Sequence, residues 1–320
     1  MTKLTLSLIR EADRLLAGKL RQTPIEHSPA LSEICGVEVR LKLENLQETG
    51  SFKVRGAYFA LSRLTQAERR RGVITCSGGN HGKAVAYVGK ELGVPARIHV
   101  PKSVDEAKLR SMRHLGADVV RSKFDGFDDT EENARRDAAK SGRTWISAYD
   151  DPIILAANGG TLALEALRQW PEARTFVLPV GGGGLGGGFS YVVKKRHPTS
   201  RFIACQHADS PALQMSLERG EAVTRLPGVE TTAGGLEGGI GRTGFSVLQS
   251  LVDDVALITE EEIFDAVRWM LEHHQYVMEP TSAVVIAALL TKRVPRLKTP
   301  TLVVISGRNL SVKTLRRILD

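Results

Sequence analysis

The chain has 320 residues, of which 42% are hydrophobic and 25% charged, a composition typical of a globular protein that needs no disulfide bonds to hold its core. Its formal net charge of 44 − 36 = +8 is not accompanied by an aromatic stacking platform, so we expect no nucleic acid partner. The three cysteines are scattered without Cys-x-x-Cys spacing, which excludes a zinc site of that kind and fits a reducing compartment.

The first predicted element is a charged, amphipathic segment, Met1–Leu20, which lacks the apolar core of a signal peptide. No later window approaches the roughly 18 apolar residues that a membrane-spanning helix requires. We therefore expect a cytoplasmic protein without a membrane partner.

Short runs of β-branched residues alternate with helical segments along most of the remaining chain. Helical periodicity is clear in Gly82–Leu92, and the pairs Ser103/Glu106 and Thr259/Glu262 have the spacing of capping boxes that open helices. This alternation predicts an α/β fold with parallel sheets and helices on both faces. The predicted strands are Val37–Leu43, Gly72–Ser77, Ala96–Val100, Ala117–Arg121, Thr144–Ile146, Thr175–Val180, Arg201–Gln206, Val255–Thr259 and Thr301–Ser306.

We expect two doubly wound lobes, with a ligand in the cleft between them. Residues 51–147 would form a small mobile lobe, and residues 1–50 and 148–320 a large one. The glycine-rich segment Gly228–Thr243 has weak periodicity and is typical of a functional loop.

A glycine run, residues 181–188, follows the predicted strand Thr175–Val180 directly, and seven of its eight residues are glycine. Such a run lets backbone N–H groups at a helix start approach a phosphate closely. It also satisfies the dinucleotide fingerprint, as any glycine tract does, but Gln206 stands where that fingerprint wants an acidic residue. No Gly-Lys-Ser/Thr follows, so it is not a P-loop.

Lys53 lies in the first turn of a predicted helix, where the helix dipole disfavours a cation. A lysine tolerated there can be partly neutral, as a lysine that forms a Schiff base must be. Taken alone, Lys53 reads as an ordinary solvated lysine. Together with the phosphate cradle, it points to pyridoxal phosphate, an aldehyde cofactor that carries a phosphate.

The segment Ser77-Gly78-Gly79-Asn80-His81 follows a predicted strand and precedes a helix. Its backbone N–H groups would suit a carboxylate, and the alternative is a turn capped by Asn80. His81 by itself is more often a structural histidine than a catalyst.

Two polar motifs near the end of the chain have two readings each. Ser306 ends the last predicted strand and could hydrogen-bond a ligand or cap the turn. Glu279-Pro280-Thr281 precedes an apolar helix and could bind a ligand or cap that helix.

Taken in order, five motifs resemble those of the fold-type II (tryptophan synthase β-like) pyridoxal phosphate enzymes, in particular the serine/threonine dehydratase and serine racemase group. They are Ser-Phe-Lys-x-Arg-Gly (51–56), Ser-x-Gly-Asn-His-Gly (77–82), Gly-Gly-Gly-Gly-Leu (181–185), Glu-Pro-Thr (279–281) and Ser-Gly-x-Asn (306–309). The resemblance extends over nearly the whole chain and implies a homodimer with the cofactor in the cleft.

The resemblance implies a role for each motif. Lys53 would form the Schiff base, Phe52 would pack beside the cofactor ring, Asn80 would bind its 3-oxygen, and Ser306 would face its nitrogen. The phosphate would be held by Gly181, Gly182, Gly183, Gly184 and the Leu185 amide. The pocket for the substrate carboxylate would be shaped by Ser77, Gly78, Gly79 and His81.

The implied activity is that of an ammonia-lyase, in which Lys53 takes the Cα proton and a β-hydroxyl leaves. The product would hydrolyse to a 2-oxo acid and ammonia. Serine or threonine is the default substrate. The segments 306–309 and 235–241 resemble dehydratases associated with hydroxyectoine use, so a hydroxyectoine-derived amino acid is the specialised alternative. We expect no regulatory domain after Asp320, which resembles the catabolic members of the group.

Three departures from the group's pattern carry information. Gly78 stands where racemases carry a second, acidic serine, which disfavours racemisation. Gln206 replaces a glutamate that binds a divalent cation in some members, and Asp209 alone is a poor site, so we expect no metal. Asn158-Gly159-Gly160-Thr161 stands where the group usually has Gly-Gln-Gly-Thr, which puts the ordinary substrate preference in doubt.

Two alternatives from other classes stay open at this stage. A nicotinamide-dependent oxidoreductase would rest on the glycine run alone. A binding protein that retains the cofactor or an amino acid without catalysis would follow from the departures at Gly78 and Asn158.

Overall fold

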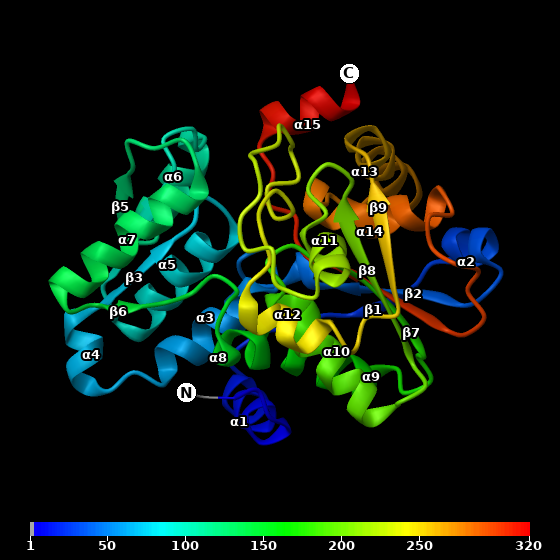
Figure 1. Ribbon diagram of the computed structural model, residues 1–320, viewed down its shortest axis with the longest axis horizontal. Coiled ribbons are helices and arrows are strands. Elements are labelled where there is room, and N and C mark those ends of the chain that lie inside the picture. The colour runs from blue at the N-terminus through cyan, green and yellow to red at the C-terminus, as the bar shows by residue number, and fades with distance from the viewer. Residues whose placement is uncertain (1–2) are drawn as a thin grey trace.

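In the computed structural model, which describes residues 3–320, the strands form two separate sheets, each flanked by helices (Figure 1). The elements in chain order are α1 (Leu6–Leu16), β1 (Ile25–His27), α2 (Pro29–Cys35), β2 (Val39–Leu43), η1 (Glu44–Leu46), α3 (Lys53–Ser62), α4 (Gln66–Arg71), β3 (Val73–Cys76), α5 (Asn80–Leu92), β4 (Ala96–Val100), α6 (Glu106–His114), β5 (Asp118–Arg121), α7 (Phe127–Ser141), β6 (Thr144–Trp145), α8 (Pro152–Leu155), the π-helical η2 (Ala156–Gly160), α9 (Thr161–Gln169), β7 (Thr175–Pro179), α10 (Gly184–Arg196), β8 (Arg201–His207), α11 (Ala212–Arg219), α12 (Arg242–Leu248), β9 (Asp254–Ile258), α13 (Glu260–His274), α14 (Pro280–Leu290), β10 (Thr301–Ile305) and α15 (Val312–Leu319).

The larger sheet has six strands in the order β1-β2-β10-β7-β8-β9. Only the edge strand β1 is antiparallel to its neighbour, and the other strands are parallel. Because parallel strands need cover on both faces, side chains alternate between two cores. On β7, Phe176 and Leu178 pack with α1, α9 and α10, whereas Val177 packs with α13 and α14. We call this sheet with its helices the large lobe.

The smaller sheet has four parallel strands in the order β5-β4-β3-β6. On β3, Val73 packs with α3 and α5, whereas Ile74 and Cys76 pack with α7 on the other face. We call this sheet with its helices the small lobe; it lies to the left in Figure 1. Both sheets confirm the predicted α/β architecture of two parallel, doubly covered sheets.

Helix α3 lies where the two lobes meet. Its residues Val54, Ala57 and Leu61 belong to the core of the small lobe, and Phe59 belongs to the core of the large lobe. The helix that begins at Lys53 is therefore held from both sides.

All nine predicted strands are present, within two residues at their ends. The sequence did not predict β1, which has only three residues. The capping box at Thr259/Glu262 is confirmed, but the one at Ser103/Glu106 is wrong. The residue that caps α6 is Asp105, whose carboxylate accepts from the Ala107 N–H at 2.7 Å.

Every strand of the small lobe falls within residues 51–147, and every strand of the large lobe falls outside that range. The exact lobe boundaries stay a prediction. No helix within residues 3–320 is both long enough and apolar enough to cross a membrane.

Candidate active site

Lys53 is the first residue of α3, and its side chain is partly buried. Its Nζ donates a hydrogen bond to the Ala148 carbonyl oxygen at 2.8 Å. Burial lowers the pKa of Lys53 to about 8, and the Glu279 carboxylate opposes this shift. A partly neutral amine was expected from the helix dipole, and the structure gives the same direction with burial as the cause.

The start of α3 lies against the end of β10. The Phe52 N–H donates to the Ser306 carbonyl oxygen at 3.1 Å, and Ser51 forms a β-bridge with Gly307. The Phe52 ring is buried, and the Lys53 Nζ lies 5.2 Å from its centroid. The fold therefore brings together Lys53, Phe52 and Ser306, which the sequence had singled out separately.

Ser306 is buried, and its Oγ lies 2.8 Å from the Oγ of Ser282. The Ser282 Oγ accepts from the Gly307 N–H at 2.7 Å and lies 2.9 Å from the Gly307 carbonyl oxygen. Ser282 has a single hydroxyl proton, which it can give either to Gly307 or to Ser306. When it donates to Ser306, the Ser306 proton is free for an acceptor such as a neutral ring nitrogen.

Asn80 and Glu279 meet across the site, although 199 positions separate them in the sequence. The Asn80 Nδ2 donates to Glu279 Oε1 at 2.6 Å. Neither residue caps its helix with its side chain, since α5 is preceded by Gly79 and Glu279 makes no side-chain bond to α14. The capping interpretation is therefore wrong for Asn80. For Glu279 the sequence left ligand binding and helix capping open. The structure shows no cap from its side chain and instead shows its contact with Asn80.

The glycine run packs closely against Tyr149 and Gly235. A Cβ on Gly182 would lie 2.4 Å from the Tyr149 ring, and a Cβ on Gly181 would lie 1.9 Å from the Gly235 carbonyl oxygen. These glycines are therefore required by close packing as well as by any ligand. Tyr149 follows Ala148, so one short segment contacts both Lys53 and the glycine run.

The same run opens α10. Gly183 has φ of 86°, in the left-handed region that favours glycine, and precedes the helix. The Gly187 N–H bonds back to the Gly183 carbonyl oxygen at 2.9 Å. Gly184, Leu185 and Gly186 come before Gly187 in the first turn, and their N–H groups have no acceptor inside the helix. This is the geometry by which a helix start binds a phosphate.

The Ser77–Gly79 turn also leads into a helix start. The Ser77 Oγ accepts from the Gly79 N–H at 3.2 Å, and Gly79 precedes α5. A Cβ on Gly78 would lie 2.3 Å from Val104 Cγ2, so the turn has no room for a side chain there. The first N–H groups of α5 remain available for an anion.

His81 turns its ring away from this turn and into the protein. Its Nε2 lies 2.9 Å from Thr75 Oγ1, whose own proton goes to the Ile146 carbonyl oxygen at 2.8 Å. Nε2 must therefore carry the proton. Burial lowers the pKa of His81 to about 3, and the nearby Lys53 adds to this effect, so the ring is neutral. Since Nε2 is committed to Thr75, any contact of His81 with a ligand would come from Nδ1 or from its backbone.

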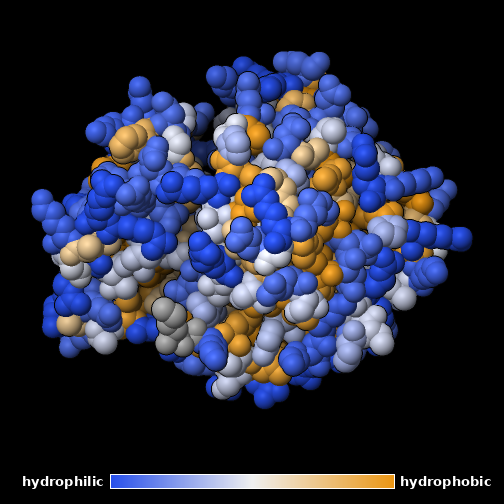
Figure 2. All heavy atoms as spheres, viewed as in Figure 1, coloured by the Kyte–Doolittle hydropathy of each residue, from blue (hydrophilic) through white to orange (hydrophobic). Residues whose placement is uncertain are grey.

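A cavity of about 290 Å³ lies between the lobes beside this site. Its walls come from α7, from the segment after β6 and from the loop before α12, and a hollow between the lobes is visible in the space-filling view (Figure 2). The residues that line it are Asp128, Glu131, Glu132, Arg135, Ser147, Tyr149, Asp150, Thr224, Arg225, Ile240, Gly241 and Arg242. A ligand in this cavity would lie beside Ala148, the partner of Lys53.

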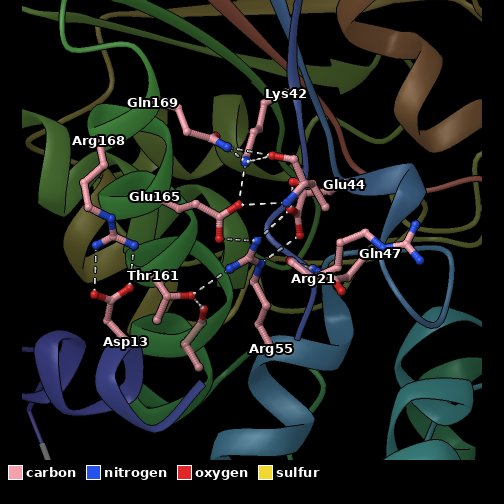
Figure 3. Close-up of polar contacts among 12 residues, drawn as sticks. Asp13, Arg21, Lys42, Glu44, Gln47, Arg55, Thr161, Glu165, Arg168 and Gln169 are labelled. Carbon is pink, nitrogen blue, oxygen red and sulfur yellow. Dashed lines mark hydrogen bonds and ion pairs between the residues drawn. The ribbon is translucent and has the colours of Figure 1, made fainter. Parts of the chain in front are cut away.

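A buried ion network anchors α3 just behind Lys53 (Figure 3). Arg55 makes a bidentate pair with Glu44, with both N–O distances at 2.8 Å, and its Nη2 also reaches Glu165 at 2.9 Å. Although burial alone would lower it, the two carboxylates hold the pKa of Arg55 above its ordinary value. The guanidinium therefore stays charged and ties α3 to η1 and α9.

Lys42 completes the network from β2. Its Nζ donates to Glu165 at 2.5 Å, to the Thr23 carbonyl oxygen at 2.6 Å and to Gln169 at 2.7 Å. Two cations and two carboxylates thus balance in the interior, as buried charges require. The sequence did not predict this network, because Lys42 and Glu165 are 123 positions apart.

Asn158 lies in η2 and is fully buried. Its Oδ1 accepts from the Gly56 N–H of α3 at 2.8 Å. Asn158 therefore affects the position of α3 through this hydrogen bond, and it does not line the cavity between the lobes.

Gln206 uses both ends of its side-chain amide inside the protein. Its Nε2 donates to the Val180 carbonyl oxygen at 2.9 Å, and its Oε1 accepts from the N–H groups of Leu213 and Gln214 at 3.0 and 3.1 Å. One side chain thus joins the end of β7 to the first turn of α11. This is the place where the resemblance would put a cation ligand.

We expect chelation to leave the protein unaffected, because Gln206 makes these contacts without a metal. Addition of EDTA should not shift the thermal midpoint, whereas Gln206→Ala should lower the free energy of unfolding by about 1–3 kcal/mol, since it leaves buried backbone groups unpaired. The exposed Gln249→Ala is the matched control. A lower midpoint in EDTA would contradict the expectation.

The residues present fit an aldehyde cofactor that carries a phosphate. The site offers an amine of lowered pKa, free N–H groups at the start of α10, and a buried hydroxyl at Ser306. Three buried polar atoms of the site segments also lack a hydrogen-bond partner among the described residues: Thr49 Oγ1, Ser51 Oγ and His81 Nδ1. Unpaired buried groups are costly, which is consistent with a ligand that pairs some of them.

Comparison with known proteins places this site in context. A family model described as "pyridoxal-phosphate dependent enzyme" matches residues 16–307. The L-threonine ammonia-lyase of Thermotoga maritima is 38% identical, over 99% of this chain and 78% of that protein. The serine racemase of Dictyostelium discoideum is 32% identical, over 100% of this chain and 99% of that protein. The solved structure of threonine deaminase isoform 2 from Solanum lycopersicum is 29% identical, with a TM-score of 0.90, and the match covers 98% of this chain and 86% of that one.

Proposed function

The chain belongs to the pyridoxal-phosphate dependent enzymes, and from this premise we propose that it is an ammonia-lyase that eliminates the β-hydroxyl of a small amino acid of the L-threonine or L-serine type. The products would be a 2-oxo acid and ammonia. The similarity to a threonine ammonia-lyase, at 38% identity, supports this proposal over racemisation, for which the relative named above is 32% identical.

The observation that carries the choice is the one-sided arrangement of the site. Lys53 would supply an amine of lowered pKa on one face of the substrate, and the resemblance puts position 78 on the other face, where glycine has no side chain to supply an acid. A racemase needs both groups, because the proton must leave from one face and return on the other. An elimination needs only the base and a leaving hydroxyl.

Bound pyridoxal phosphate supplies the electron sink that makes the Cα proton of an amino acid acidic. The chain supplies the rest. Lys53 would take that proton, while free N–H groups at the start of α10 would hold the phosphate. The Ser77–Gly79 turn would hold the substrate carboxylate, and Ser306 would donate to the neutral ring nitrogen. A neutral hydroxyl there does not hold the nitrogen protonated, which favours prompt loss of the β-hydroxyl.

The test is release of 2-oxo acid from a panel of β-hydroxy amino acids by the purified protein. We expect turnover of L-threonine or L-serine by a yellow protein that borohydride bleaches. Binding of the cofactor without release from any member of the panel would favour the binding-protein alternative instead.

We expect Gly78→Ser alone not to create a racemase. The new Cβ would lie 2.3 Å from Val104 Cγ2, so either the turn or the Val104 side chain must shift to admit the serine. Gly78→Ser should lower the thermal midpoint and the elimination rate, and the double variant Gly78→Ser/Val104→Ala should recover the midpoint. A chiral assay for D-serine checks the single and double variants. D-serine formation by the single variant at a rate near that of elimination would contradict this reading.

The finer assignments are part of the same proposal. A hydroxyectoine-derived amino acid is the second candidate substrate, on the resemblance of the segments 235–241 and 306–309. The first of these lies against the glycine run, where the Gly241 N–H donates to the Gly182 carbonyl oxygen at 3.1 Å. Including that substrate in the panel tests it. A homodimer rests on the resemblance, and light scattering tests it. A cytoplasmic location and the lobe boundaries rest on the sequence pattern and stay predictions.

A further inference from the structure

The side-chain amide of Asn80 lies in a chain of hydrogen bonds that runs from a cation to a carboxylate. The Lys83 Nζ donates to Asn309 Oδ1 at 2.8 Å, and the Asn309 Nδ2 donates to Asn80 Oδ1 at 2.7 Å. At the other end, the Asn80 Nδ2 donates to Glu279 Oε1 at 2.6 Å. We call these four residues the Asn80 relay.

The chemistry of its two ends gives the relay one direction. The ammonium of Lys83 only donates, so Asn309 must turn its oxygen toward it. The two N–H groups of Asn309 then go to the Thr49 carbonyl oxygen, at 2.8 Å, and to Asn80. An ionised Glu279 only accepts, so it requires an N–H of Asn80. Both ends therefore demand the same orientation of the Asn80 amide.

This orientation leaves one group of Asn80 unused. Its oxygen is taken by Asn309 and one of its N–H groups by Glu279. The second N–H on Nδ2 has no partner within the relay. It is a directed donor, and it suits an acceptor atom on a ligand.

The relay is packed closely enough to hold that orientation. Gly50 has φ of 75°, and a Cβ there would lie 2.8 Å from Asn309 Oδ1. A Cβ on Gly307 would lie 2.3 Å from Glu279 Oε1. The Glu279 side chain is 7% exposed, and among residues 3–320 it forms no ion pair within 4 Å. Burial raises the pKa of Glu279 to about 7, against the hydrogen bond from Asn80. Capping of α14 does not account for this buried carboxylate, since the Glu279 side chain makes no hydrogen bond to that helix.

We propose that Lys83, Asn309 and Glu279 are positioning residues that hold the Asn80 amide with its free N–H directed at the 3-oxygen of the cofactor ring. The inference rests on the proposed function, in which Asn80 contacts that oxygen. It assigns a role to Glu279 and Lys83, to which the resemblance gave no contact with the cofactor or the substrate.

The test is titration of the apo-protein with pyridoxal phosphate, followed by the visible absorbance of the bound cofactor. Lys83→Met removes one end of the relay, and Glu279→Gln replaces the acceptor-only carboxylate at the other end by an amide that can also donate. Each variant no longer fixes the orientation of Asn80, so each should raise the dissociation constant about tenfold, the effect of losing one directed hydrogen bond. The band of the bound cofactor should shift in both variants. The exposed Glu272→Gln and Lys90→Met are the matched controls and should leave affinity and band unchanged.

A double-mutant cycle separates this positioning role from a general structural one. In an Asn80→Ala background, neither Glu279→Gln nor Lys83→Met should weaken the affinity further, because both act through Asn80. Lys83 is only half-buried, so its variant keeps the test open if the Glu279 variant folds poorly.

Two results would overturn the relay while leaving the proposed function intact. One is wild-type affinity in both single variants, and the other is a tenfold loss that persists without Asn80. A wild-type protein that binds no pyridoxal phosphate would instead overturn the proposed function, and the relay with it.

Discussion

Lys53→Ala is expected to lower the rate of 2-oxo acid release by about 10⁴-fold or more, because general-base catalysis alone contributes about 10²–10⁴ and covalent attachment is lost as well. The variant should also be colourless after dialysis. Its matched control, Lys140→Ala, removes an exposed lysine and should keep both colour and rate. A Lys53→Ala variant with a tenth of the wild-type rate would remove this lysine from the reaction.

The same substitution has a pH signature in the apo-protein. The pKa of Lys53 is lowered from 10.5 to about 8 in the folded state, so the unfolded chain binds this proton more tightly. Stability therefore rises as the pH increases from about 8 toward 10.5, because in this window the unfolded state binds more protons than the folded one. Lys53→Ala removes this increment, so the difference in thermal midpoint between wild type and variant should change across that window. A constant difference would mean that the amine keeps its ordinary pKa.

Arg55→Met is expected to cause a large loss of stability. It leaves Glu44 with no guanidinium partner and Glu165 with only Lys42, in a site where all these side chains are buried (Figure 3). Removing one partner of a buried ion pair costs about 3–5 kcal/mol, because an uncompensated charge remains. Unfolding in urea measures the loss.

The matched control for Arg55 lies beside it in Figure 3. Arg168 pairs with Asp13 through two hydrogen bonds of 2.8 and 3.0 Å, but its side chain is 55% exposed. Exposed pairs contribute about 0–1 kcal/mol, so Arg168→Met should change stability little. Equal losses in the two variants would mean that burial does not decide the strength of the Arg55 contacts. Because Arg55 is two residues from Lys53, its loss should also lower cofactor affinity.

The strands were predictable because each is a short β-branched run between turn residues, a local signal that the fold preserves. Strand β1 has three residues and no alternating pattern, so it is defined only by its pairing with β2. Asp105 displaced Ser103 as the cap of α6 because either residue is a suitable cap and only the path of the backbone decides.

The candidate site was predictable where a motif is contiguous, as at Lys53 and the glycine run. It was not predictable where chemistry depends on distant partners. For Glu279 the sequence allowed either a ligand contact or a helix cap, and it gave no sign of the contact with Asn80 at 2.6 Å. His81 was expected to shape the pocket for the substrate carboxylate, and the sequence did not predict that its ring would form a hydrogen bond with Thr75 of β3. The ion network joins Lys42, Arg55 and Glu165, none of which has a local signature.

The position of β10 between β2 and β7 determines when the site can exist during synthesis. A ribosome makes β2 early, but its parallel partner arrives only with residues 301–305. Until then the large sheet is split, with the β1–β2 pair detached from β7, and its exposed edges invite association with other chains. Ser306 and Asn309 leave the ribosome later still. The nascent chain therefore carries Lys53 and the glycine run well before it carries the strand that completes the large sheet and the residues that follow that strand.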